Sequence, residues 1–364
     1  MTEKFEDGAV KPMDTAQRSP PDRWVRPSRP EDAPGIIALM RQAGLAPHVD
    51  PEQLHWKYWR ERTDSADPRS FVLTDGRNLL AHGAAMPGLL RWGPRRARVI
   101  HMIDWAARRD AVGAGVQLMK HVGGLTEFLF GVGGSAQTLK IMPLIGYRLC
   151  GTVVGYARPL SPLALLRQPT RARWKLGPRF GRTLLWTLAA GTREVGGLAA
   201  RRIGPDDIEQ IAGVLPTEDG SLPFLERPPG FLRHALACPI VPMELYSVER
   251  AGRIRGYFVL SFVPGQARLA DWWIDSREPS ARSALLGLAV DQVKARPGLA
   301  ELVTWSSDPD ISGSLIDCGF RERLTLPIYF RASVGREVPG QGVRVQMLDN
   351  DAFYLHFEND ELWI

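Results

Sequence analysis

The segment from Asp104 to Met119, DWAARRDAVGAGVQLM, combines residue types that can bind a phosphorylated ligand. A predicted strand runs into Gly113-Ala114-Gly115, and a helix is expected to begin there. Small residues let the backbone approach a ligand closely, and free N–H groups at a helix start favour a pyrophosphate. Arg108 and Arg109 would add positive charge for the phosphate oxygens. We therefore predict a pyrophosphate-binding loop at this junction.

Two well-known phosphate motifs are excluded by the spacing in this segment. The unit before the loop lacks the strand–helix–strand order and the GxGxxG spacing of the dinucleotide-binding motif. A Walker A loop needs Gly-Lys followed by Ser or Thr, which is also missing. The two glycines alone are a weak signal, so their meaning depends on the elements around them.

The elements that would position this loop follow from hydrophobic periodicity and turn residues. In order, we expect helices over 31–45 and 51–60, strands on both sides of a turn at Asp75-Gly76, a strand over 97–107, a helix from 116, a strand over 126–133, a helix over 135–145 and a strand over 147–160. This order predicts an α+β unit (α/β mixed sheet) of about 130 residues.

With the loop in place, this order resembles the GCN5-related N-acetyltransferase (GNAT) family. The acyl-CoA motif of that family, Arg/Gln-x-x-Gly-x-Gly/Ala, lies at the same strand-to-helix junction. The segment Asp110-Ala-Val-Gly113-Ala-Gly115 keeps both glycines but has Asp in the first place. Arg109 could substitute, or the motif could be shifted so that Val112 comes first. The resemblance covers about residues 25–157, including the WKYW segment after the second helix.

The resemblance implies that acetyl-CoA, or another acyl-CoA, is the co-substrate. Backbone amides of the loop would hold the CoA pyrophosphate, and the end of the preceding strand would line the pantetheine and the thioester. The cofactor-binding residues implied are Trp105, Ala106, Ala107, Arg109, Asp110, Ala111, Val112, Gly113, Ala114, Gly115, Val116 and Ser135.

The family's usual general acid is missing from this chain. A Tyr in the pattern Asn-x-x-Ala-x-x-Leu-Tyr-x-x-x-Gly-Phe commonly protonates the leaving thiolate in the family. With Gly146-Tyr147 placed on Gly-Phe, Ser135 aligns with the Asn and Met142 with the Tyr. Met cannot donate a proton. A thiolate leaves well without full protonation, so transfer does not strictly need this Tyr.

Transfer to an amine also needs a base, and Asp104 is the candidate catalytic residue, because it stands close to where a thioester would lie. The alternative is that it caps the loop or pairs with Arg108 or Arg109. Aromatic residues could stack on a planar acceptor or pack in the core: Trp56, Trp59, Trp105, Trp272 and Trp273. No metal is expected, since His82, His101 and His121 lack metal-ligand spacing and are interpreted as structural.

Several short patterns recur in the same order at offsets of 167 to 175 residues. Pro30-Glu31-Asp32 returns as Pro205-Asp206-Asp207, Phe71 as Tyr246, Asp104-Trp105 as Asp271-Trp272, and Gly146-Tyr147 as Gly319-Phe320. Such spacing indicates an internal duplication. We predict two tandem GNAT-like domains over 25–157 and 199–334, each a mostly antiparallel sheet flanked by helices.

The second copy departs from the acyl-CoA motif. Ser280 and Arg282 replace the glycines, and Leu315 takes the place of the family's Tyr. Side chains there would crowd a pyrophosphate. We expect this copy to serve as a scaffold or as one wall of an acceptor cleft.

The remaining segments are predicted as a flexible leader over 1–24, a basic linker over 158–198, and a strand with an acidic tail over 335–364. Between Arg158 and Arg182 the linker has six Arg, one Lys and no acid. It could contact an anionic partner such as nucleic acid, lipid head groups or an acidic glycan, or be a solvated connection. Its LLWTLAA run is too short to span a bilayer but could lie at an interface.

Composition sets the outer limits. The 364 residues are 44% hydrophobic and 24% charged, which suits a sizeable core and two domains. A net charge of +6 is too weak to argue for specific nucleic-acid binding. Three distant cysteines fit reduced thiols in a cytoplasmic protein. Neither a signal peptide nor a membrane span is expected.

These patterns predict an acyl-CoA-dependent N-acyltransferase that transfers an acyl group, acetyl in the simplest case, to an amine. The acceptor could be an amino sugar, a small amine or a protein amine. Tandem members of the family are associated with bacterial surface-polysaccharide pathways, an analogy and not a property of these residues. The alternative is a GNAT-fold binding or regulatory protein that has lost turnover. The oligomeric state does not follow from the sequence.

Overall fold

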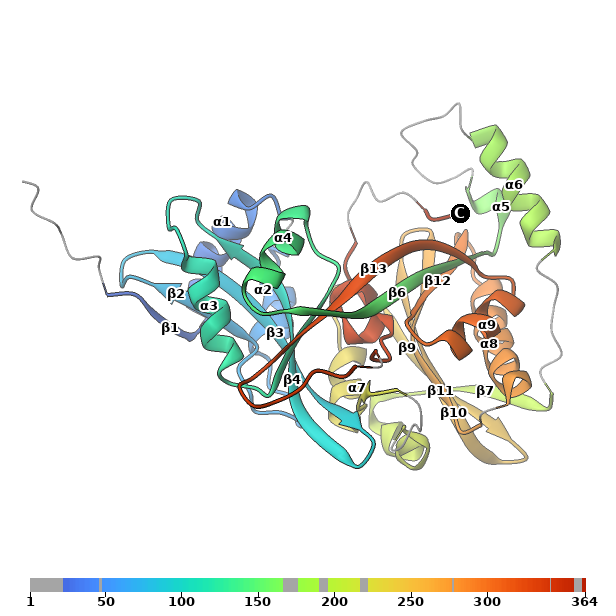
Figure 1. Cartoon of the computed structure of the whole chain (residues 1–364). Coiled ribbons are helices and arrows are strands. Elements are labelled where there is room, and N and C mark those ends of the chain that lie inside the picture. The colour runs from blue at the N-terminus through green and yellow to red at the C-terminus, as the bar shows by residue number, and fades with distance from the viewer. Residues whose placement is uncertain are drawn as a thin grey trace, which may run out of the picture.

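The chain was analysed as a computed structural model that describes residues 22–45, 48–165, 176–189, 196–216, 222–276, 278–340, 342–356 and 362–364. The described residues form one continuous sheet in the order β1-β2-β3-β4-β5-β13-β6-β12-β11-β10-β9-β7, with β8 pairing with β3 (Figure 1). Its neighbouring strands are antiparallel except at β4–β5 and β11–β12, where they are parallel.

The N-terminal half matches the predicted element order. It contains β1 (Trp24–Pro27), η1 (Pro30–Asp32), α1 (Ala33–Gln42), α2 (Pro51–Leu54), the π-helical turn η2 (His55–Trp59), β2 (Ser70–Thr74), β3 (Leu79–Trp92), β4 (Arg95–Ala107), α3 (Ala114–Gly123), β5 (Phe128–Val132), α4 (Ala136–Leu144) and β6 (Arg148–Pro159). The main difference is that the second helix ends at Leu54 and continues as the wider π turn.

The C-terminal half repeats this order after α5 (Pro162–Leu165) and α6 (Leu176–Ala189). It contains β7 (Leu198–Ile203), η4 (Pro205–Val214), β8 (Phe224–Leu225), α7 (Pro229–Leu236), β9 (Met243–Arg250), β10 (Arg253–Val263), β11 (Gln266–Ile274), α8 (Pro279–Lys294), β12 (Glu301–Ser306), α9 (Pro309–Asp317), β13 (Arg321–Ala332), η5 (Met347–Asp349) and η6 (Asp351–Phe353). In both halves an antiparallel meander leads to a helix, a parallel strand, a second helix and a closing strand.

The two closing strands are exchanged between the halves. After α4, β6 pairs with β12 of the other half, and β13 pairs with β5, so that the two closing strands also lie next to each other. Figure 1 shows β6 and β13 crossing the middle of the molecule. The closing strand predicted in each domain therefore completes the other half. Hydrogen bonds across this exchange join both halves into one sheet.

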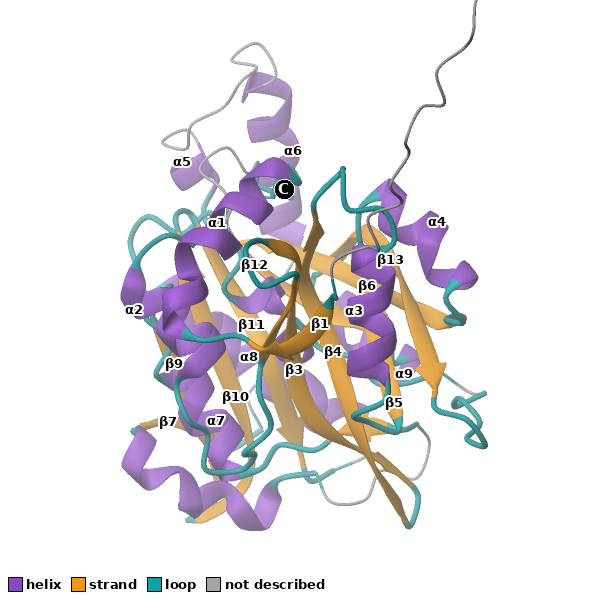
Figure 2. Ribbon diagram, turned by 90° about the vertical axis from the view of Figure 1, so that its left-hand side faces the viewer, coloured by secondary structure: helices purple, strands orange, loops and turns teal. Residues whose placement is uncertain are grey.

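Helices cover both faces of the N-terminal half, as Figure 2 shows for α1 and α3. Because side chains alternate along a strand, Phe71 and Leu73 of β2 pack with α3 and α4, while Val72 packs with α1 and α2. A third apolar cluster lies between the halves and includes Phe130 of β5 and Trp305 of β12. This cluster therefore buries apolar side chains of both halves where they meet.

The predicted leader, linker and tail differ in part from the structure. Residues 1–21, 166–175, 190–195, 341 and 357–361 lie outside the described residues. Arg158 belongs to β6, because that strand keeps pairing with β12 as far as Pro159; its buried side chain donates a hydrogen bond to the carbonyl of Cys318. The rest of the described linker contains the helices α5 and α6.

The C-terminal segment 342–356 forms two short 3-10 turns and one bridge between Arg344 and Phe224, instead of the predicted strand. Its backbone is held partly by side chains: Ser307 Oγ donates to Val343 O at 2.7 Å and accepts from Val345 N at 2.7 Å. No helix in the described part of the chain is long and apolar enough to cross a membrane. The three cysteines are free.

Candidate active site

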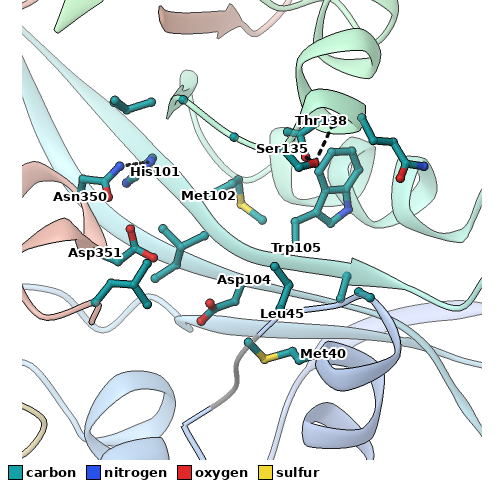
Figure 3. Close-up of a pocket in the computed structure, with 18 of the residues that line it drawn as sticks. Met40, Leu45, His101, Met102, Asp104, Trp105, Ser135, Thr138, Asn350 and Asp351 are labelled. Carbon is teal, nitrogen blue, oxygen red and sulfur yellow. Dashed lines mark hydrogen bonds between the residues drawn. The ribbon is translucent and has the colours of Figure 1, made fainter. Parts of the chain in front are cut away.

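The candidate site lies where β4 and β5 separate. The two parallel strands pair only over Val99–His101 and Phe128–Phe130, and then diverge. A cavity of about 1100 Å³ opens there and is lined from both halves of the protein (Figure 3). It runs from α3 and α4 through the opened sheet to side chains of β12 and the segment 342–356, among them Trp305 and Asp351.

A β-bulge in β4 shapes the centre of this opening. Ala84 pairs with Ile103 and His82 with Ala106, so one residue is left over, and Asp104 takes a φ of +49°. Asp tolerates this left-handed conformation better than most residues do. His82 Nδ1 donates to the carbonyl of Asp104 at 3.2 Å, which holds the bulge. Beyond His101, β4 no longer pairs with β5. The backbone N–H and C=O groups on that edge of β4 can therefore bind a ligand.

A chain of hydrogen bonds fixes the ring that holds the bulge. Trp59 Nε1 donates to Ser28 Oγ at 3.0 Å, Ser28 Oγ donates to Ser70 Oγ at 2.6 Å, and Ser70 Oγ lies 2.9 Å from His82 Nε2. Burial lowers the pKa of His82 to about 4, so its ring is neutral, with Nδ1 as donor. Two residues of the sequence prediction, Trp59 and His82, are thus structural supports of the site.

The side chain of Asp104 is held by Lys57 and Tyr58 from the π turn. Lys57 Nζ lies 2.5 Å from Asp104 Oδ2, with both side chains nearly inaccessible, and the Tyr58 hydroxyl donates to the same oxygen at 2.9 Å. Burial alone would raise the pKa of Asp104, but the charge of Lys57 and the two hydrogen bonds outweigh it, so the pKa lies below its usual value. Neither predicted partner forms an ion pair with Asp104 in the described part of the chain: Lys57 takes that place, and Arg108 pairs with Asp110.

A second carboxylate, Asp351, lines the same cavity and comes from the C-terminal segment (Figure 3). No other described residue donates a hydrogen bond to its side chain or forms an ion pair with it. Burial, together with the charge of Asp104, raises the pKa of Asp351 to about 6, and Lys57 opposes that rise. The site therefore holds one carboxylate that stays ionised and one that can exchange a proton near neutral pH.

The predicted phosphate loop is open. Gly113 has a φ of +78° and directly precedes α3, and a Cβ placed on it would meet no atom within 4 Å. The N–H groups of Gly115 and Val116 have no backbone acceptor among the described residues. They point out of the start of a ten-residue helix, where the helix dipole favours an anion.

Most of the predicted cofactor-binding residues line this one cavity: Trp105, Ala106, Ala107, Arg109, Ala111, Val112, Gly113, Ala114, Gly115, Val116 and Ser135. Asp110 does not, because it turns to Arg108, whose Nε lies 2.9 Å from its Oδ1. Ser135 caps α4 by accepting from Thr138 N at 3.1 Å, and its hydroxyl lies 3.0 Å from that of Thr138.

The sequence reasoning missed Asp351, Asn350 and Trp305. Asp351 was included in the acidic tail, and its only signal was its place in an acidic, polar run, LDND. Trp305 lines the cavity, and its indole Nε1 is buried with no acceptor among the described residues. Of the five tryptophans predicted to stack or pack, Trp105 lines the cavity, whereas Trp56, for example, stacks on His234 in the core.

Comparison with known proteins identifies the fold. No protein-family model matches the chain, and no curated protein matches it. Among solved structures, a GCN5-related N-acetyltransferase from Anabaena variabilis is similar, with a TM-score of 0.57, 12% identity, and coverage of 85% of this chain and 73% of that one. An N-myristoyltransferase from Saccharomyces cerevisiae with bound myristoyl-CoA is similar with a TM-score of 0.59, 14% identity, and coverage of 88% and 82%.

A GCN5-related N-acetyltransferase from Kribbella flavida gives a TM-score of 0.56 at 14% identity, over 85% of this chain and 71% of that one. This chain has the GNAT fold. At these identities the similarity establishes the fold alone, and the predicted fold class is confirmed.

In the second half of this GNAT fold, the position that corresponds to the opening is filled. Gln346 of the C-terminal segment donates through Nε2 to Trp272 O and accepts through Oε1 from Trp272 N, both at 3.1 Å. These backbone groups lie on β11 beyond its paired stretch with β12, Gln266–Leu269. Asp271, the counterpart of Asp104, is buried in a pair with Arg227, whose Nε lies 3.0 Å from Oδ2.

The start of α8 is also unsuited to an anion. Glu278 directly precedes the helix, and Pro279, its first residue, has no N–H. A carboxylate there repels phosphate. Neither feature favours phosphate binding at this helix start, and the expectation that the second copy does not bind CoA stays a prediction.

The buried pair of Lys57 and Asp104 predicts a stability effect. Asp104→Asn keeps a side chain that tolerates the left-handed backbone, but it leaves the Lys57 charge buried and without a carboxylate. We expect a loss of about 3–5 kcal/mol in the free energy of unfolding, measured by urea denaturation. The double variant Lys57→Met/Asp104→Asn should recover part of that loss. Asp110→Asn, at an exposed pair, is the control with little expected change, and equal losses in both Asp→Asn variants would contradict the interpretation.

Proposed function

We propose that this protein transfers an acyl group from acyl-CoA to the nitrogen of an amine. The observation that carries the proposal is the single cavity through the separated strands β4 and β5. It joins an open helix start at Gly113 to a carboxylate, Asp351, that has no ion-pair partner among the described residues. A long thioester donor with an anionic end needs a site of this length and polarity.

The chain offers groups for the pyrophosphate, the pantetheine and the thioester of an acyl-CoA. The N–H groups of Gly115 and Val116 and the guanidinium of Arg109 would bind the pyrophosphate. The free edge of β4 beyond His101 would receive the pantetheine amides, with the thioester near Trp105. Met142 lines the cavity where the family's Tyr would stand. The hydroxyls of Ser135 and Thr138 lie at the start of α4, the helix that contains Met142. They would instead stabilise the leaving thiolate by hydrogen bonding.

We propose Asp351 as the group that removes the proton from the acceptor ammonium. The freed amine attacks the thioester carbon, the C–S bond breaks, and the CoA thiolate leaves and takes up the second proton, which the nitrogen gives up as the amide forms. Asp104 is a weaker base than the sequence alone suggested, because its ion pair with Lys57 lowers its pKa. Its role in this proposal is electrostatic, because its negative charge helps to raise the pKa of Asp351.

The acceptor would enter from the side of the C-terminal half. Trp305 offers to a polar oxygen an indole N–H that has no acceptor among the described residues, and the walls there include Val263, Leu326 and Trp363. An amine beside apolar or ring atoms fits these surroundings, which is compatible with an amino sugar, a small amine or a protein amine. Acetyl is the acyl group that we propose, and the cavity volume makes longer chains worth testing alongside it.

The test is a thiol-release assay with acetyl-, octanoyl- and myristoyl-CoA against a panel of amines. We expect CoA to bind at one site per chain by calorimetry, and amine-dependent release of free thiol with one of the acyl-CoAs. Absence of any acyl-CoA binding would overturn the proposal. Binding without turnover would favour a second candidate function, a GNAT-fold protein that senses acyl-CoA, which the Met at 142 and the Leu at 315 support.

A further inference from the structure

An exposed apolar surface lies on α5 and α6, the helices that connect the two halves in the sequence. It consists of Leu163 on α5 and Leu184, Leu185 and Leu188 on α6, which we call the outer leucine face. Their exposed fractions are 66%, 41%, 70% and 72%. In Figure 1 these two helices lie at the edge of the molecule, beside β6 and away from the N-terminal half. A surface helix ordinarily presents charged and polar side chains outwards, so this face needs an explanation.

The opposite side of α6 anchors the helix and fixes which way the leucines point. Trp186 is buried, and its Nε1 donates to the carbonyl of Gly319 at 2.9 Å. The guanidinium of Arg323 lies 4.5 Å from the centre of its ring. Thr183 is buried one turn earlier, and Arg179 donates to the carbonyl of Leu362 at 3.0 Å. Because one side of the helix is held, the outer leucine face cannot turn inwards.

Among the described residues of α5 and α6, every charged side chain is positive: Arg179 and Arg182, both on α6. On the anchored side, β13 brings Arg321 and Arg323 beside Trp186. No Asp or Glu occurs in the sequence from Arg158 to Arg193. A contact with a second copy would need an apolar face but would gain nothing from a surplus of arginine. Apolar side chains flanked by cations instead match the boundary between acyl chains and anionic head groups.

We propose that α5 and α6 bind the surface of an anionic lipid bilayer. Leu163, Leu184, Leu185 and Leu188 insert among the upper acyl chains, and Arg182 meets the phosphates. The helix lies along the surface and does not cross it, since its 14 residues are too few to span a bilayer. The four leucines are not part of the cavity described above, so this inference does not rest on the proposed function.

The experiment is co-sedimentation of the full chain with vesicles. We expect binding to mixed phosphatidylcholine and phosphatidylglycerol vesicles, weak binding to phosphatidylcholine alone, and weaker binding as salt is added. The variant Leu184→Ser/Leu185→Ser/Leu188→Ser should bind at least about tenfold more weakly, because three apolar side chains no longer insert. A matched control, Leu144→Ser/Leu149→Ser/Ile316→Ser, changes three other exposed apolar residues and should bind normally.

Two results would overturn this inference. One is no difference between anionic and neutral vesicles. The other is a dimer in sedimentation equilibrium that the outer-face variant dissociates, which would assign the face to a second copy. Circular dichroism and thermal melting of both triple variants show whether either result comes from misfolding.

Discussion

Asp351→Asn is expected to lower kcat about 10²–10³-fold while acyl-CoA still binds, because the amide cannot accept the proton of the acceptor ammonium. The wild-type kcat/KM should fall tenfold per pH unit below about pH 6, as the raised pKa of Asp351 requires. The variant should lose this break. Steady-state kinetics across pH, with binding followed by calorimetry, measures both effects.

Asp351→Asn should also be more stable than the wild type. Removing a carboxylate that stabilised the fold would have the opposite effect. The pKa of Asp351 is about 6 in the folded protein, against a usual value of 3.8, so the folded state binds the proton more tightly. The contribution of this group to stability is therefore lost as pH rises from 3.8 to 6. We expect Asp351→Asn to melt at a higher temperature than the wild type above pH 6, with the difference vanishing at low pH.

Asp275→Asn, at an exposed carboxylate of the second half, is the control for Asp351→Asn and should change neither activity nor the pH profile. If Asp351→Asn keeps wild-type kcat and the same break near pH 6, Asp351 is not the base. Asp104 would then become the leading candidate for the base again, and Asp104→Asn, unlike Asp351→Asn, should lower kcat.

Gly113→Trp is expected to weaken CoA binding at least about a hundredfold. The indole would fill the open space in front of the Gly115 and Val116 amides, and the positive φ of Gly113 would strain any side chain there. Calorimetry with CoA and acetyl-CoA measures the loss. Because the outer part of the loop is exposed, the melting temperature should fall by only a few degrees.

The matched control is Gly252→Trp. Gly252 also has a left-handed φ, +75°, and open space around it, but it lies in the turn between β9 and β10 of the second half. It should lose similar stability and no CoA affinity. Equal CoA affinity in both variants would place the pyrophosphate elsewhere and remove the main support for an acyl-CoA site, whatever the role of Asp351.

The fold was predictable where its signals are local. The helix after Gly113 and the hairpin at Asp75-Gly76 follow from neighbouring residues, and β4 from its own apolar run. The recurring pairs Asp104-Trp105 and Asp271-Trp272 lie on corresponding strands, β4 and β11, and each strand has a register shift against its neighbour. The exchange of β6 and β13 was not predictable, because the sequence of a closing strand specifies a buried, two-sided strand and not which neighbour it pairs with.

The sequence by itself determined the order of elements, the open glycine loop at Gly113 and the Met at position 142, since each depends on residue type and short spacing. Only the tertiary structure decided which carboxylate has a lowered pKa and which a raised one. The pKa of a carboxylate depends on burial and on charges within a few ångströms, and such neighbours come from distant parts of the chain. Lys57 reaches Asp104 from a π turn, and Asp351 reaches the same cavity from the far end, so one carboxylate keeps its charge and the other can give it up.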